Sequence, residues 1–147
     1  MIILLALVVV IVVSIIVAFL VTGNTAKQDY IKIGKDEVPS VKLILGEERN
    51  ITGVSSSVTN GVRTKEIKYS VTEHQSEEMF RYAQALVDNY GFYSLNDSDF
   101  TGDRGYGFEF AKESSEDGYI VIVRIDYDRS GYTITLSRGV GTLTLIY

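Results

Sequence analysis

The sequence lacks several residue types on which common folds and sites depend. Its 147 residues include no Cys, no Trp, one His and one Pro. Without Cys there is no disulfide scaffold, thiolate zinc site or cysteine nucleophile, and a single His excludes a site with several histidine ligands. The 14 basic residues are outnumbered by 19 acidic ones, which gives a net charge of −5. Because nucleic-acid binding requires cations that neutralise phosphates, and no run of basic residues is present, we expect no nucleic-acid partner.

An uninterrupted apolar run opens the sequence. Residues 1–21 carry no charged side chain, and Ser14 is the single polar one among them. As a helix they would be about 31 Å long, close to the hydrocarbon thickness of a bilayer. They predict a single-pass anchor in the cell membrane, with the lipid bilayer as a partner. A cleaved signal peptide is the alternative, but the run is longer than signal peptides have and no basic residue precedes it.

The side of the membrane on which the rest of the chain lies is weakly specified. Lys27, Lys32 and Lys35 follow the apolar run, and the positive-inside rule would place them in the cytoplasm. That rule loses force for long domains, which cross largely regardless of charge. An anchor followed by a single domain is also a usual way to display that domain outside. We therefore expect an extracytoplasmic domain.

The remainder divides into a tether and one domain. Residues 22–37 are polar and of mixed charge, and they predict a tether; residues 38–147 then form a single domain. Alternating apolar and polar positions predict strands at 41–45, 52–59, 62–72, 106–110, 119–127, 132–137 and 142–147. Asn60 and Gly61 predict a two-residue hairpin turn, since both tolerate the positive φ that such turns need.

One amphipathic helix is predicted over residues 73–90. Thr72 and Gln75 fit a capping box, Glu78 is expected in solvent near the helix start, and Gly91 follows as the stop signal. The apolar positions fall on one side: Met79, Tyr82, Ala83, Leu86, Val87 and Tyr90. The sequence therefore predicts an α+β fold with an antiparallel sheet of six or seven strands, in the order β-β-β-α-β-β-β. The helix packs on one face of the sheet, and the other face is polar.

The segment 97–103 resembles the start of a calcium loop. Asp97, Asp99 and Thr101 occupy alternate positions, Gly follows at the sixth and Asp103 at the seventh. Calcium favours such convergent oxygens, but the twelfth position, where Glu is expected, is Phe108. Turns also collect Asp, Asn, Ser and Gly, and we favour that interpretation. The calcium interpretation, with Asp97, Asp99, Thr101 and Asp103 as ligands, stays open.

The other candidate residues favour structural roles. A second fragment, 126–131, repeats the beginning of the calcium pattern and is again read as a turn. His74 is expected as a solvated residue at the helix start. Arg124 and Asp126 share one strand face and predict a surface ion pair with a neighbouring strand. The Gly-containing stretch 138–142 lacks the lysine and following helix of a phosphate-binding loop, and it predicts a turn or bulge.

These observations identify no catalytic or cofactor-binding residue. They favour a membrane-anchored, non-enzymatic binding or interaction module for an unknown protein or small ligand. The alternative is a metal-dependent, calcium-binding or enzymatic domain that uses the acidic loop at 97–103.

Overall fold

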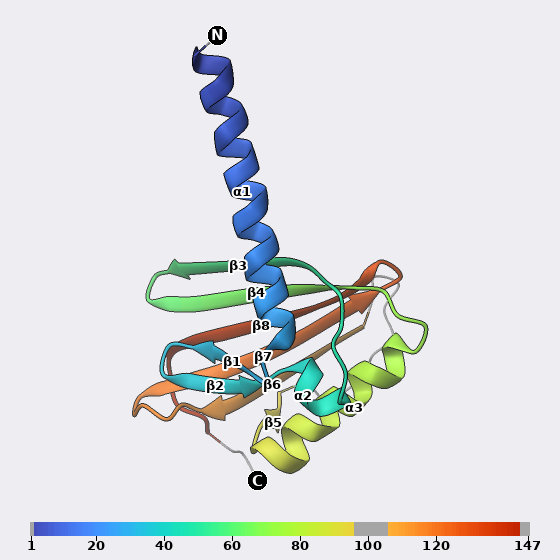
Figure 1. The fold of residues 1–147 in the computed structure, drawn as a ribbon. Helices are drawn as coiled ribbons and strands as arrows, with labels where there is room; N and C mark the ends of the chain where they lie inside the picture. Colours follow the sequence, from blue (N-terminus) through green and yellow to red (C-terminus); the bar gives the residue numbers. More distant parts are fainter. Residues whose placement is uncertain (1, 96–105, 145–147) are drawn as a thin grey trace.

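The computed structural model describes residues 2–95 and 106–144 (Figure 1). An N-terminal helix is followed by a small hairpin, a short helix, a long hairpin, a second long helix and four further strands. In chain order the elements are α1 (Ile2–Lys27), β1 (Tyr30–Ile33), β2 (Asp36–Pro39), α2 (Val41–Leu45), β3 (Ile51–Thr59), β4 (Val62–Ser70), α3 (Gln75–Tyr90), β5 (Tyr93–Ser94), β6 (Tyr106–Glu113), β7 (Tyr119–Asp128) and β8 (Gly131–Val140).

Six of the strands form one antiparallel sheet. Its order is β3-β4-β8-β7-β6-β5, and each pair of neighbours is antiparallel. The other two, β1 and β2, form a separate two-stranded sheet. The predicted α+β class and antiparallel sheet are confirmed. The predicted strand number matches only in part, because β5 was not predicted and the segment predicted as the first strand is not in the sheet. The small sheet was not predicted as such.

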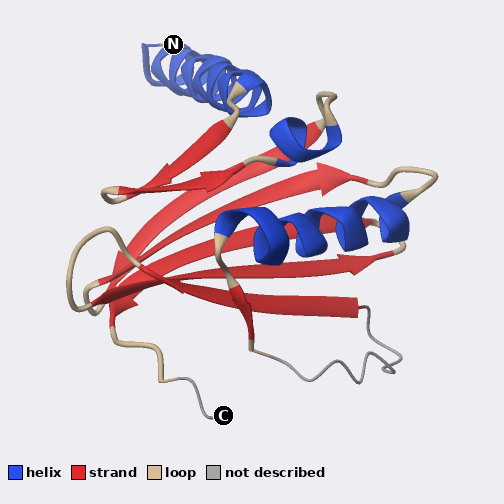
Figure 2. Cartoon of the chain, turned by 90° about the horizontal axis from the view of Figure 1, so that it is seen from below, coloured by secondary structure: helices blue, strands red, loops and turns tan. Residues whose placement is uncertain are grey.

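Elements other than the sheet lie on one of its faces (Figure 2). Helices α2 and α3 and the β1–β2 hairpin all lie on this covered face. The core between the two layers contains inward-facing residues of β4, β7 and β8 together with the helix stripe of α3; its fully buried members include Ile67, Met79, Tyr82, Leu86, Val123, Ile125, Ile134 and Leu136. Within the described part of the chain, no helix or strand covers the opposite face, which we call the open face.

The long hairpin and the long helix follow their local sequence signals. Asn60 and Gly61 have φ values of 51° and 80°, so both turn positions of the β3–β4 hairpin are left-handed as predicted. Gly91 ends α3 with φ 71°, and its N–H donates to the Leu86 carbonyl. The predicted capping box is wrong, because no side chain caps α3. The Thr72 hydroxyl instead donates to Glu78.

Residues 41–45 are a helix, not the predicted strand. The Ser40 hydroxyl accepts the Leu43 N–H at 3.1 Å and caps the N-terminus of α2. Gly46, with φ 82°, ends the helix after little more than one turn. In so short a segment the alternation of apolar residues fits either structure, and the caps at both ends favour the helix.

Much of the predicted tether is ordered structure. Helix α1 continues to Lys27, and the β1–β2 hairpin follows almost at once. Ile31, Ile33 and Val38 are at most 4% exposed and belong to the hydrophobic core. The division of the chain into anchor, tether and domain remains a prediction, but the hairpin is packed onto the sheet and is not a free linker.

Helix α1 is long and apolar enough to cross a membrane, a property that an N-terminal signal sequence would share. Where its side chains are described, from Val10 on, the apolar ones are largely exposed; Val10, Ile15 and Leu20 each expose more than 60% of their surface. The C-terminal end of α1 packs beside β3, and the helix then extends away from the sheet beyond this edge strand (Figure 1). If α1 spans a bilayer, β3 is therefore the strand of the sheet that lies nearest to it.

Candidate ligand-binding face

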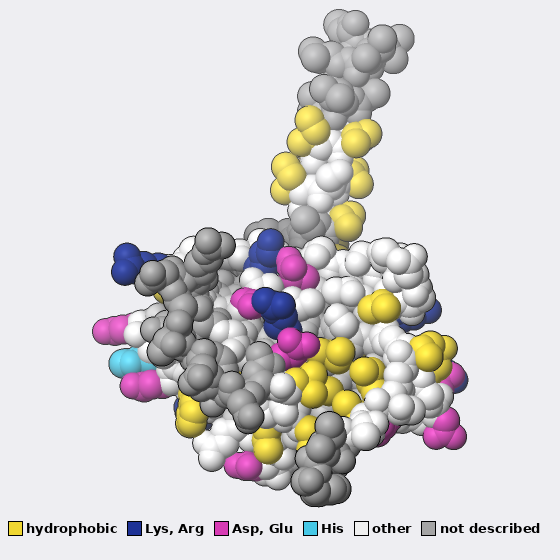
Figure 3. All heavy atoms as spheres, turned by 180° about the vertical axis from the view of Figure 1, so that it is seen from behind, with side chains coloured by type: hydrophobic (Ala, Val, Ile, Leu, Met, Phe, Trp, Pro, Cys, Tyr) yellow, Lys and Arg dark blue, Asp and Glu magenta, His cyan; other side chains and the backbone are white. Residues whose placement is uncertain are grey.

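The open face combines charged, hydroxyl and apolar side chains (Figure 3). Alternation along the strands places Glu66 and Lys68 of β4 and Arg124 and Asp126 of β7 on this face, while Ile67 and Ile125 between them are buried on the other. The outward residues of β8 are small: Thr133, Thr135 and Ser137. Further along β7, two half-buried isoleucines, Ile120 and Ile122, add an apolar strip. The polar face predicted from the sequence is present, with this apolar addition.

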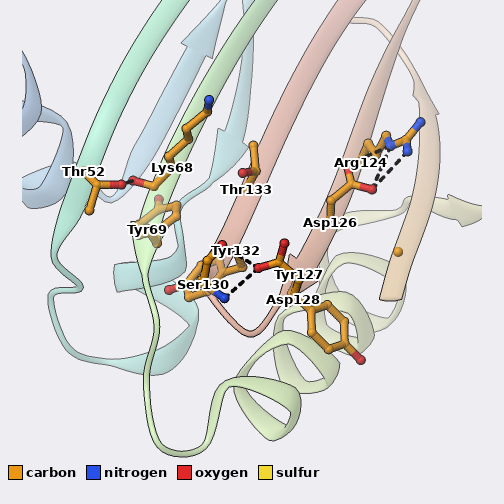
Figure 4. A pocket seen from close by; sticks show the side chains of 12 residues that line it. Thr52, Lys68, Tyr69, Arg124, Asp126, Tyr127, Asp128, Ser130, Tyr132 and Thr133 are labelled. Carbon is orange, nitrogen blue, oxygen red and sulfur yellow. Dashed lines mark hydrogen bonds and ion pairs between the residues drawn. The ribbon is translucent and has the colours of Figure 1, made fainter. Parts of the chain in front are cut away.

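A hollow of about 420 Å³ lies on the open face, at the end of the sheet next to the β7–β8 turn (Figure 4). Lys68 and Thr52 line it on the β3–β4 side, and Arg124 and Asp126 line it on the β7 side. Thr133 lies between them on β8. The small outward residues of β8, set between longer side chains on β4 and β7, leave the space that forms the hollow.

Arg124 and Asp126 form an ion pair within the hollow. Arg124 Nε lies 2.8 Å from Asp126 Oδ2, and Nη2 lies 3.0 Å from Oδ1. Hydrogen bonding to Asp126 raises the pKa of Arg124, which stays a cation. Gly107, opposite Asp126 on β6, leaves room for the carboxylate, because a Cβ there would lie 3.2 Å from Oδ1. The two residues pair with each other along one strand, not with a neighbouring strand as predicted.

This ion pair is open to solvent. The side chains of Arg124 and Asp126 are 59% and 44% exposed. Exposed pairs contribute little to stability, so a ligand can rearrange this one at small cost. On the opposite wall, Lys68 Nζ lies 3.2 Å from Oε1 of Glu66, a residue of β4 that does not itself line the hollow. The hollow therefore presents cations, carboxylates and hydroxyls together.

The fragment 126–131 contains the end of β7, a two-residue turn and the first residue of β8, in agreement with the predicted turn. Asp128 Oδ1 accepts the Ser130 N–H at 2.7 Å and the Ser130 hydroxyl at 2.6 Å. These bonds lower the pKa of Asp128 and close the β7–β8 turn. Asp126 is bound by Arg124 and does not face Asp128 as a second ligand would. Among residues 2–95 and 106–144, no group of three or more His, Asp or Glu side chains could hold a metal ion.

The predicted calcium ligands Asp97, Asp99, Thr101 and Asp103 lie outside the described residues. The calcium interpretation of the 97–103 loop therefore remains a prediction. His74 is at the start of α3 with a 68% exposed side chain, and its Nδ1 lies 3.9 Å from Glu77. It is not among the residues that line the hollow.

Two ionic groups were missed from the sequence. Arg138 and Asp36 form a buried pair, with Nε and Oδ2 2.7 Å apart and both side chains less than 10% exposed. Arg138 is part of β8, not of the predicted turn; it continues the buried alternation of Ile134 and Leu136, which is the signal that could have placed it. Glu78, expected in solvent, is 12% exposed in its side chain and pairs with Arg49 at 2.8 Å.

The chain was also compared with known proteins. No protein-family model, curated protein or solved structure matches it, so a function must be inferred from the geometry of its own residues.

Proposed function

We propose that the chain is a membrane-anchored, non-enzymatic binding module whose ligand lies on the open face of the six-stranded sheet. The observation that carries this proposal is the hollow between β4 and β7, lined by Lys68, Thr52, Thr133, Arg124 and Asp126. A concave site with a few convergent polar groups is the usual form of a ligand site.

The chemistry of the hollow favours a polar ligand with an acidic group. An incoming carboxylate can take the place of Asp126 on the Arg124 guanidinium, which offers two parallel N–H donors. Lys68 and Thr133 supply further donors beside it. Ile122 is the next outward residue along β7, so a ligand longer than the hollow meets an apolar surface there. A protein segment with an acidic residue next to an apolar one fits this arrangement.

The non-enzymatic part of the proposal rests on composition and on the lining of the hollow. The chain has no Cys, and its one His lies outside the hollow. The Asp126 carboxylate is engaged by Arg124 through two nitrogens, which makes it a poor general base.

The anchoring part rests on α1. In this proposal residues 1–21 span the bilayer and the domain lies on the extracytoplasmic side. We expect the full chain to remain with the membrane fraction after alkaline carbonate extraction, and added protease to remove the domain from intact cells. A mature protein found in the soluble fraction and lacking its apolar run would contradict the anchor, and protection until lysis would contradict the sidedness.

Site-specific crosslinking tests the ligand face. Because the chain has no Cys, Thr133→Cys introduces a unique thiol in the hollow, to which a photoreactive group is attached. Gln84→Cys, on the exposed side of α3, is the matched control. In native membranes we expect a discrete adduct from position 133 only, reduced about tenfold by Arg124→Gln, the loss expected when a charged hydrogen bond is removed.

Two results would contradict the proposed binding face. Equal adducts from positions 84 and 133 would mean that the label reports random collision. An adduct at 133 that is unaffected by Arg124→Gln would mean that the guanidinium does not bind the ligand.

A further inference from the structure

A second hollow lies on the covered side of the sheet and is lined by basic residues. It has a volume of about 290 Å³ and lies between the tip of the β1–β2 hairpin and the first residues of β4. Lys32, Arg63, Lys65 and Ser56 line it, and no carboxylate is among the lining residues. Ser57 and Thr64 also border it, but they pair with each other across β3 and β4 and alternate with Ser56 and Lys65, so their side chains face the open side of the sheet. In a chain with a net charge of −5, three cations around one hollow stand out.

The cations are largely uncompensated. Lys32 lies 3.6 Å from Glu37, but both side chains are more than half exposed. Within the described residues, neither Arg63 nor Lys65 forms an ion pair. Cations that have no carboxylate partner and share a hollow with a hydroxyl group suit an anion such as a phosphate, which accepts hydrogen bonds from both.

The position of the hollow relates it to the membrane. Ser56 and Ser57 belong to β3, the edge strand beside which the end of α1 packs. The β1–β2 hairpin and α1 lie on the same side of the sheet (Figure 1). Val58, the next residue of β3, also lines the hollow and is 62% exposed. An exposed apolar residue beside a basic group is typical of a protein surface that contacts a bilayer.

We propose that this basic hollow binds the phosphate headgroup of an anionic lipid in the bilayer that α1 spans. The inference rests on the membrane anchoring proposed above and adds a lipid class to it. Arg63 and Lys65 bind the phosphate, Ser56 donates a hydroxyl hydrogen bond, and Val58 contacts the boundary of the acyl chains. The β3–β4 hairpin is thereby docked against the membrane surface.

A fluorescent label on the hairpin measures this docking in the full-length protein. Thr59→Cys places a unique thiol at the exposed end of β3, outside the residues that line the hollow. The protein carries a polarity-sensitive fluorophore there and is reconstituted into phosphatidylcholine vesicles with or without phosphatidylglycerol. We expect blue-shifted emission on the anionic vesicles only, and reversal of the shift by salt.

Charge variants identify the residues that bind. Each cation near an anionic surface contributes about a fivefold factor, so Arg63→Gln or Lys65→Gln is expected to lower the ratio of docked to undocked protein about fivefold. Arg81→Gln, which removes an exposed cation on α3, is the matched control and is expected to leave the ratio unchanged. Lys65→Arg, which keeps the charge, is expected to retain docking.

The outcomes separate this proposal from the anchoring on which it rests. Flotation with both kinds of vesicle shows the anchor independently of the label, and failure to float would contradict the proposed function itself. With flotation intact, the same emission on neutral and anionic vesicles would overturn the lipid site, as would equal effects of Arg81→Gln and Lys65→Gln. If inorganic phosphate produces the shift on neutral vesicles, the hollow takes free phosphate and the lipid assignment is wrong.

Discussion

Asp36 is the residue whose replacement tests the packing of the fold most directly. Its carboxylate accepts the Ser114 hydroxyl at 2.6 Å, the Ser115 N–H at 2.7 Å and Arg138 Nε at 2.7 Å. A second nitrogen of Arg138 donates to Glu116. One buried group thus joins the β1–β2 hairpin, the β6–β7 loop and β8, three parts of the chain that are distant in sequence.

Asp36→Asn removes the charge and keeps the shape of the side chain. The buried Arg138 guanidinium then loses one of its two carboxylate partners, and breaking a buried ion pair costs about 3 kcal/mol. We expect that loss in the free energy of unfolding, measured by urea with tyrosine fluorescence on the full chain in detergent micelles. Glu37→Gln is the control; Glu37 is its exposed neighbour and is expected to cost about 0.5 kcal/mol or less.

The pH dependence gives this prediction a sign. Burial by itself would raise the pKa of Asp36, but the hydrogen bonds from Ser114, Ser115 and Arg138 outweigh it and lower the pKa from 3.8 to about 2. A carboxylate whose pKa is lowered in the folded state stabilises the fold at pH values above its pKa in the unfolded state. This stabilisation, about 2 kcal/mol here, is lost as the pH falls through the folded-state pKa. The difference between wild type and Asp36→Asn should therefore shrink between pH about 4 and pH about 2. A difference that stays constant through this range would refute the buried-carboxylate reasoning.

Three further predictions address the helix, the turns and the acidic loop. Leu86→Ala should lower the free energy of unfolding by about 2–5 kcal/mol by leaving a cavity under α3. Glu78→Ala should lower it by about 2 kcal/mol, because Arg49 then keeps only the exposed Glu47 as its carboxylate partner. Two small shifts in the urea midpoint would mean that α3 is not docked. Gly131→Ala should lower the free energy of unfolding by about 3 kcal/mol or more, since its Cβ would lie 2.2 Å from a backbone oxygen. Gly118→Ala, with open space around it, should lower it by about 1 kcal/mol. Similar melting temperatures for the two variants would contradict the turn geometry. Calcium should leave the melting temperature unchanged, and a rise that Asp97→Asn abolishes would establish the calcium site instead.

The features predicted correctly are those determined by nearby residues. The β3–β4 hairpin depends on the positive φ that Asn60 and Gly61 tolerate, and α3 depends on the spacing of its own apolar residues and on Gly91. These requirements are met within a few residues along the chain. They can therefore be read without knowing what the segment packs against.

The features that were missed depend on residues far away in sequence. Asp36 and Arg138 are 102 positions apart, and nothing near Asp36 distinguishes it from the charged residues of a tether. Glu78 lies on the polar side of α3 in the sequence pattern, but Arg49, 29 positions before it, draws it into a half-buried pair. The hollow in the open face could be anticipated only as a polar surface, because its shape depends on which strands are neighbours in the sheet.

Strand β4 connects the two proposed binding surfaces and also keeps them apart. Its side chains alternate, so Arg63 and Lys65 line the basic hollow on the covered side, while Lys68 lines the hollow on the open face. Helix α1 lies on the covered side and leaves past β3, so a bilayer around it would meet the edge of the sheet and leave the open face in water (Figure 1). The two surfaces should therefore respond separately. Arg124→Gln should weaken crosslinking at position 133 without changing lipid docking. Lys65→Gln should weaken lipid docking without changing crosslinking at position 133.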